Sequence, residues 1–176
     1  AQFMVVLDIA IVNVALPSIQ HTLDAGQSTL QWVIIAYGLL LGGFLLLGGR
    51  MVDLLGSRRI LLTGMTIFST ASLVSGLAQS SALLIAARGV QGFGAALVAP
   101  AALATLALTF REGPERNRAL GIFGAIGGAS ASLGVIASGF LTDGPGWRWV
   151  FFINVPVGIV LITLASVFLA ADRRER

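Results

Sequence analysis

The sequence predicts an all-α membrane protein built as a bundle of six transmembrane helices. Hydrophobic residues make up 56% of the 176 residues and charged residues 11%, whereas an average soluble domain has about 25% charged residues. Apolar runs long enough to cross a bilayer, about 20 residues each, recur along the chain. Short links that carry most of the arginines separate these runs. The composition and the spacing of the runs therefore disfavour a soluble globular domain.

The first three spans are expected at about residues 2–19, 30–49 and 60–78. The first span contains a single charge, Asp8, and ends at a polar segment that begins with Gln20. The second span is rich in leucine and glycine and ends at Arg50. The third span starts directly after Arg59 and ends before Gln79. Polar residues thus mark both ends of the third apolar run.

The last three spans are expected at about residues 82–110, 119–141 and 149–171. The fourth contains Arg88 and also Pro100, which we expect to bend this long helix. The fifth is rich in glycine, alanine and serine, small residues that let membrane helices approach one another. The sixth starts at Trp149 and ends before a basic tail.

The arginines predict the orientation, because cytoplasmic links are enriched in basic residues. One side of the predicted bundle carries nine of them: Arg50, Arg58, Arg59, Arg111, Arg116, Arg118, Arg173, Arg174 and Arg176. The opposite links carry Arg148 alone, and Trp32, Trp147 and Trp149 fall at that boundary, where amphipathic rings are enriched. We therefore expect both ends of the chain in the cytoplasm. Since neither an initial Met nor a signal peptide is present, we expect a piece of a longer protein.

The residue types exclude several kinds of catalytic site. With no cysteine and one histidine, His21, the chain lacks thiolate nucleophiles, clustered metal ligands and a histidine base for its hydroxyls. The glycine-rich residues 89–96 are similar to a dinucleotide fingerprint, but an apolar run with Pro100 follows instead of an amphipathic helix. Most of the arginines lie in short links between membrane spans and not on one surface of a water-soluble domain, which disfavours nucleic-acid binding. We expect no enzyme activity, cofactor, metal or nucleic-acid partner.

Two ionisable groups, Asp8 and Arg88, lie within predicted spans, where each costs about 2.5–3.5 kcal/mol. If their helices are neighbours, desolvation would favour the protonated form of Asp8 and the arginine its ionised form, a balance suited to proton exchange. A structural ion pair, or an aspartate in a water-filled cavity, is the alternative. Asn13, Tyr37 and Gln91 are further polar groups at membrane depth, which could bond another helix or contact a ligand in a cavity.

The link between the second and third spans is expected to be a turn that gates the protein. Gly49 and Gly56 would allow close backbone approach, and Asp53 could face the positive end of another helix. Arg58 and Arg59 would anchor the turn at the anionic leaflet. An ordinary arginine-rich link is the alternative, although it accounts only for the arginines.

The fifth span carries two ladders of small residues. Gly124 and Gly128 form one, and Ser130, Gly134 and Ser138 form the other. Such ladders are typical of closely packed membrane helices. The alternative is a helix that slides or rocks against its neighbours.

Four segments carry a resemblance to a known family. They are LDIAIVNVALP at residues 7–17, GRMVDLLGSRR at 49–59, RGVQGFG at 88–94 and WRWVFFINVPVG at 147–158. In this order they resemble motifs of the major facilitator superfamily, and within it the fourteen-helix drug:proton antiporter branch. The resemblance implies the N-terminal six-helix half, made of inverted three-helix repeats that rock against a C-terminal half.

The resemblance also implies roles for individual residues. Asp8 and Arg88 would serve proton exchange or bind a cationic substrate, and Asp53 would steady one conformation. The fifth-helix antiporter motif, which ends at Gly139, usually has proline where Val135 stands and glycine where Ser138 stands.

The link departs from the family pattern as well, since Leu54 and Ser57 stand where basic residues are common. These departures weaken the inference of antiport from the two motifs concerned.

We therefore hypothesise proton-coupled efflux of amphipathic, cationic compounds across the bacterial plasma membrane. The expected partners are a small-molecule substrate, membrane lipid and the C-terminal half, and the proton gradient would drive transport without a cofactor. One alternative is a facilitator-type carrier for another solute, in which Asp8 and Arg88 are structural. The other is a six-helix channel or assembly module without antiport.

Overall fold

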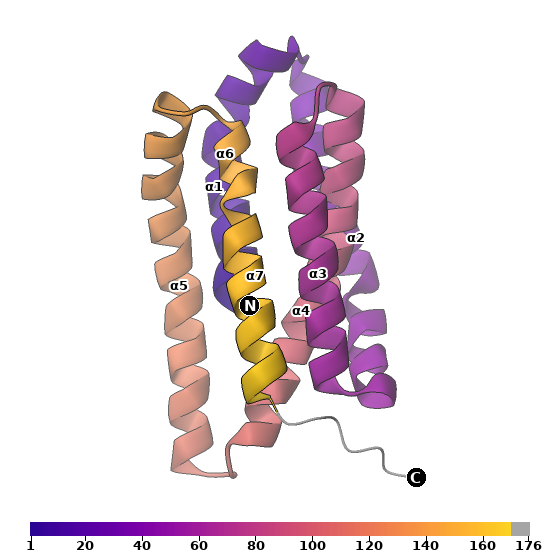
Figure 1. The fold of residues 1–176 in the computed structure, drawn as a ribbon, viewed down its shortest axis with the longest axis vertical. Coiled ribbons are helices and arrows are strands. Elements are labelled where there is room, and N and C mark those ends of the chain that lie inside the picture. Colours follow the sequence, from indigo (N-terminus) through magenta and orange to yellow (C-terminus); the bar gives the residue numbers. More distant parts are fainter. Residues whose placement is uncertain (170–176) are drawn as a thin grey trace.

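A computed structural model describes residues 1–169 of the chain, with Asp143 described by its backbone alone. These residues form a bundle of long helices (Figure 1). The helices are α1 (Gln2–Leu23), α2 (Gln27–Leu55), α3 (Ser57–Leu77), α4 (Ser81–Thr109), α5 (Pro114–Asp143), α6 (Arg148–Phe152) and α7 (Asn154–Phe168). Within the described residues, six stretches are long and apolar enough to cross a membrane, the last being α6 and α7 together. The predicted all-α fold with six spans is confirmed.

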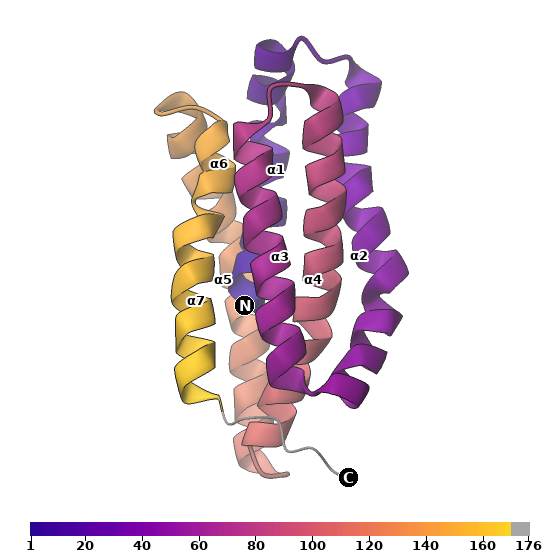
Figure 2. The same cartoon turned by 45° about the vertical axis from the view of Figure 1, so that its right-hand side comes forward.

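The links alternate between the two ends of the bundle (Figures 1 and 2). The α1–α2, α3–α4 and α5–α6 links lie at one end, and the α2–α3 and α4–α5 links, with their arginines, lie at the other. Trp32 and Trp149 lie near the starts of α2 and α6, at the end opposite these arginines. Residues 170–171 of the sixth predicted span, and Arg173, Arg174 and Arg176, lie outside the described residues.

The N-terminal end does not reach either end of the bundle. Both views place it part-way along the bundle's height (Figure 2). Ala1 lies beside Met65 of α3, Ala102 of α4 and Leu161 of α7. Ala1 therefore lies among the helices.

The predicted turn between the second and third spans is a single residue. Helix α2 continues through Arg50 to Leu55, and α3 begins at Ser57. Gly56 alone turns the chain. Its φ of 94° and ψ of 147° form a backbone conformation that residues other than glycine rarely adopt. The prediction of a turn over residues 49–59 was wrong because the loss of hydrophobicity after Gly49 does not end a helix.

The close backbone approach predicted for Gly49 occurs at the preceding residue. A Cβ at Gly48 would lie 3.0 Å from the carbonyl carbon of Ala96 on α4, whereas a Cβ at Gly49 would meet no atom within 4 Å. The two glycines point to different faces of α2, and only Gly48 faces α4. This contact brings the second half of α2 against α4.

The sixth span is divided between α6 and α7 at Ile153. Pro156 has no N–H to bond the carbonyl of Phe152 four residues earlier, which weakens the helix at this point. At its start, Arg148 donates hydrogen bonds from Nη1 to the carbonyls of Gly76 (2.9 Å) and Ala78 (2.6 Å). Because the last carbonyls of a helix lack partners within it, this arginine caps α3 and holds α6 against it.

Candidate functional site

An ion pair lies in the interior of the bundle, between α1 and α4. Asp8 is 0% exposed and Arg88 is 2% exposed, and Nη1 of the arginine lies 2.6 Å from Oδ2 of the carboxylate. The expected proximity of these two helices is therefore observed. Neither side chain faces an open cavity in this structure.

The carboxylate of Asp8 accepts hydrogen bonds from three side chains. Besides Arg88, Gln91 donates from Nε2 to Oδ1 at 2.9 Å, and Asn154 donates from Nδ2 to the same oxygen at 2.7 Å. Gln91 in turn accepts from Nη1 of Arg88 at 2.9 Å through its own Oε1. Hydrogen bonds to an ionised group are about twice as strong as neutral ones, so this arrangement suits an ionised Asp8.

Helix α2 holds the arginine from the other side. Nε of Arg88 donates to the carbonyl of Val33 at 3.4 Å, and the guanidinium carbon lies 4.2 Å from the centre of the Tyr37 ring. Gly92 allows this arrangement, because a Cβ there would lie 2.9 Å from the carbonyl carbon of Tyr37. A guanidinium over an aromatic face gains about 2 kcal/mol where water is excluded.

The enclosure of the pair determines what it can do chemically. A buried charge needs a partner and hydrogen bonds, since removing one partner of such a pair costs about 3–5 kcal/mol. Asp8 has both, and it has no contact with solvent in this conformation. In this conformation the carboxylate is therefore closed to water.

Asn154 is a member of this cluster that the sequence analysis did not assign to the site. It is 1% exposed, and Nδ2 also donates to Oγ of Ser72 on α3 at 3.0 Å. The hydroxyl of Ser72 donates to the carbonyl of Phe151 at 2.8 Å. A carboxamide within the apolar sixth span, two residues before Pro156, was the available signal.

The other predicted polar residues lie in different surroundings. Tyr37 is buried, and its hydroxyl has no hydrogen-bond partner among the described residues. Gln91 is fully buried within the cluster. Asn13 is exposed on α1. Gln91 makes the interhelical hydrogen bond that was one of its two expected roles, and the ring of Tyr37 lies against the guanidinium of Arg88.

The predicted gate residues face two directions. Asp53 is exposed at the end of α2, and its carboxylate has no hydrogen-bond or ion-pair partner within residues 1–169. Arg58 donates from Nη2 to the carbonyl of Ser166 on α7 at 2.6 Å. Arg59 is exposed beside it at the start of α3. The start of α3 is thus tied to the end of α7, while Asp53 is directed outward.

Two of the five predicted packing residues of α5 contact another helix. Ser138 donates to the carbonyl of Ile11 at 2.8 Å, and a Cβ at Gly134 would lie 2.7 Å from Cβ of Ala10 on α1. A Cβ at any of the other three, Gly124, Gly128 and Gly139, would meet no atom within 4 Å. Only one ladder of α5 packs within this bundle, because the face that bears the other turns away from α1.

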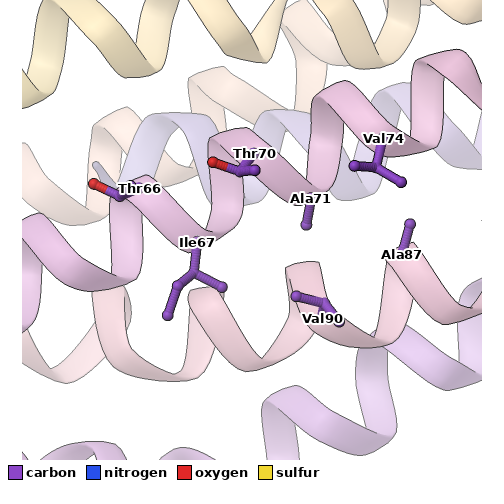
Figure 3. A pocket seen from close by; sticks show the side chains of 7 residues that line it. All are labelled: Thr66, Ile67, Thr70, Ala71, Val74, Ala87 and Val90. Atoms are coloured by element: carbon purple, nitrogen blue, oxygen red, sulfur yellow. The ribbon is translucent and has the colours of Figure 1, made fainter.

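A groove of about 290 Å³ lies between α3 and α4 (Figure 3). It is lined by Thr66, Ile67, Thr70, Ala71, Val74, Ala87 and Val90. None of these side chains is ionisable, so the groove offers no partner for a charged ligand. Within residues 1–169, no three His, Cys, Asp or Glu residues gather as metal ligands would.

In comparisons with known proteins, the whole chain, residues 1–176, matches the family model described as Major Facilitator Superfamily. The puromycin resistance protein pur8 of Streptomyces alboniger is 46% identical over 174 residues, which are 99% of this chain and 34% of pur8. The cephamycin export protein CmcT of Amycolatopsis lactamdurans is 44% identical over 175 residues, 99% of this chain and 36% of CmcT. The multidrug resistance protein Stp of Mycobacterium tuberculosis (strain ATCC 25618 / H37Rv) is 40% identical over 174 residues, 99% of this chain and 32% of Stp. The chain spans about a third of the length of these curated relatives.

Proposed function

Because the chain belongs to the major facilitator superfamily, we propose that it is the N-terminal part of a proton-coupled exporter of amphipathic, cationic compounds. The relatives named above are resistance and export proteins. The six spans make the chain a multi-pass membrane protein. The arginines at one end of the bundle support an orientation with that end in the bacterial cytoplasm.

The observation that carries this proposal is the enclosed carboxylate of Asp8. In the described conformation it accepts hydrogen bonds from three side chains, one of which is the guanidinium of Arg88. A proton on Asp8 removes the negative charge and leaves the guanidinium without its counter-ion. The buried cation then favours a conformation in which water or another acceptor reaches it.

The dependence of conformation on the charge of Asp8 explains how a proton could be exchanged for a cationic substrate. A protonated Asp8 no longer attracts a cation, and an ionised Asp8 does, so a proton and a cationic substrate compete for the same group. Movement of α1 against α4 opens the carboxylate to one side of the membrane at a time. The proton gradient supplies the driving force, with no cofactor.

The rest of the transporter is the partner that this proposal needs. We assign to the remaining chain of the parent protein a second bundle that encloses the substrate, with membrane lipid around both. Asp53 is directed outward without a partner among the described residues, which supports its role as a gate facing that second bundle. Ser138 replaces the usual glycine and bonds α1, so at this position α5 is tied to the helix that carries Asp8.

The test uses the full-length parent in everted membrane vesicles. Asp8→Asn is expected to abolish dye efflux driven by a pH gradient, whereas Thr22→Ala, a change at an exposed position near the end of the same helix, leaves it unchanged. Size-exclusion profiles of both variants check that the protein is folded. Unchanged efflux by a folded Asp8→Asn protein, with an unchanged pH profile, would refute the proposal.

A second measurement separates antiport from a facilitator-type carrier. Addition of a cationic substrate to the purified parent is expected to release protons into a weakly buffered solution, and Asp8→Asn is expected to abolish the release. If substrate binds without proton release, Asp8 and Arg88 are a structural pair and the facilitator alternative holds.

A further inference from the structure

The division of the sixth span lies next to the ion pair. Helix α6 ends at Phe152 and α7 begins at Asn154, the residue that donates to Asp8. The carbonyl of Phe151 accepts the hydroxyl of Ser72 on α3 at 2.8 Å. Pro156 removes a further backbone bond at this point. Side chains of α3 and α1 therefore bond the sixth span on both sides of Ile153.

A directed series of hydrogen bonds joins Asp8 to this break. A carboxamide nitrogen has two N–H groups, and Asn154 uses one on Asp8 at 2.7 Å and the other on Ser72 at 3.0 Å. Because Oγ of Ser72 accepts from Asn154, its own proton is free to bond the carbonyl of Phe151. Each bond in the series orients the next.

Helix α3 packs closely on both sides of the break. A Cβ at Gly76 would lie 2.7 Å from Cδ1 of Phe152 on α6, and a Cβ at Gly158 of α7 would lie 3.0 Å from Cβ of Ser69. Both segments of the sixth span are thus held to the same helix. A change in their mutual angle is therefore expected between the two contacts, from Phe152 to Gly158, a stretch that includes Asn154.

No other side chain of the sixth span links it electrostatically to Asp8. Helix α7 has no ionisable residue, and Arg148 of α6 bonds the last carbonyls of α3. The charged or titratable groups that face Asp8 are Arg88 of α4 and Tyr37 of α2. Asn154 is therefore the contact through which the sixth span senses the charge of Asp8.

We propose that Asn154 is a positioning residue that couples the protonation state of Asp8 to the break between α6 and α7. The proposal rests on the proposed function, in which Asp8 carries the proton. Ionised Asp8 holds the carboxamide by a charge-assisted bond, and a neutral acceptor holds it about half as strongly. Protonation therefore weakens the contact that holds Asn154 and, through Asn154, loosens the series that continues to Ser72 and the carbonyl of Phe151.

Hydrogen–deuterium exchange of the full-length parent in lipid nanodiscs tests the coupling. The backbone amides of residues 152–155, 157 and 158 are measured at one pH in the wild type, Asp8→Asn, Asn154→Leu and the double variant. Each single change is expected to speed their exchange about tenfold, the effect of losing a hydrogen bond to a charged group. Thr22→Ala, at an exposed position of α1, is the matched control and leaves the exchange unchanged.

The double variant identifies the coupling. If Asp8 acts on the break through Asn154, the double variant exchanges no faster than the faster single variant. If the two effects multiply to about a hundredfold, Asp8 and Asn154 act independently and the proposal falls. Where Asn154→Leu does not fold, Ser72→Ala breaks the same series one step later and is combined with Asp8→Asn in its place.

The outcome is distinguishable from a failure of the proposed function. Loss of proton-driven efflux in Asp8→Asn, with unchanged exchange at the break, leaves the exporter proposal standing and overturns the role of Asn154. Retained efflux in Asp8→Asn refutes the proton-carrying role of Asp8 and, with it, the coupling.

Discussion

Helices α4 and α5 are both long, apolar and rich in glycine, yet their glycines serve different purposes. In α4, a Cβ at Gly92 would lie 2.9 Å from the backbone of Tyr37, and one at Gly94 would lie 2.8 Å from the backbone nitrogen of Phe68. In α5, a Cβ at Gly124 or Gly128 would meet nothing within 4 Å. A small residue therefore permits close packing, but close packing occurs only where the fold places that residue against another helix.

The polar residues of α4 also make more contacts with other helices than the polar residues of α5 do. Arg88 and Gln91 of α4 lie one turn apart, bond each other and both bond Asp8. Ser138 of α5 bonds only a backbone carbonyl, that of Ile11. Helix α4 is held by charge, hydrogen bonds and packing, so we expect it to tolerate substitutions much less than α5 does.

The largest contrast is expected between an arginine on each helix. Arg88→Leu leaves Asp8 buried without a counter-ion and should lower the free energy of unfolding of the parent protein by about 3–5 kcal/mol. Arg116→Leu on α5 removes a surface pair with Glu112, whose charged atoms lie 3.4 Å apart, and should cost about 0–1 kcal/mol. Thermal unfolding in detergent compares the two, and equal losses would show that the interior pair contributes nothing special.

A smaller contrast is expected between glycines. Gly92→Ala forces α2 and α4 apart and should destabilise the protein by about 1–3 kcal/mol, as overpacking does. Gly124→Ala has free space and should leave stability unchanged or raise it by about 0.5–1 kcal/mol through helix propensity. The same unfolding measurement applies. A loss for Gly124→Ala as large as that for Gly92→Ala would contradict the open face assigned to α5.

The smallest effect is expected at the contact that α5 makes with α1. Ser138→Ala removes the hydrogen bond to Ile11, and such bonds between membrane helices are worth about 0.6 kcal/mol on average. Ser132→Ala, on an exposed position of the same helix, is the control and should have no effect. Indistinguishable unfolding midpoints for the two variants would mean that the Ser138 bond does not hold α5.

The sequence predicted the order of the spans and the pairing of Asp8 with Arg88 for the same physical reason. Lipid requires long apolar runs, and it requires each buried charge to have a partner. Both requirements act locally on residue type, so they can be read without knowing the packing. Helix ends were predicted less well, because polar residues such as those after Gly49 continue the helix beyond the apolar run.

The parts of the site that the sequence did not predict depend on how distant segments of the chain pack together. Asn154 joins the cluster only because the sixth span lies against α1 and α3, and a single carboxamide does not reveal its partner. The choice of Gly48 over Gly49, and of Gly134 over Gly124, depends on which face of a helix meets its neighbour. Counting small residues along the chain does not give that face.

The single-residue junction at Gly56 has a mechanical consequence. Helices α2 and α3 meet there with no slack, since α2 ends at Leu55 and α3 starts at Ser57. Two helices joined by one residue can tilt together or change the angle between their axes, but neither can slide along the other. A displacement of the end of α2, where Asp53 is exposed, therefore also displaces the start of α3. Helix α3 in turn packs against both α6 and α7.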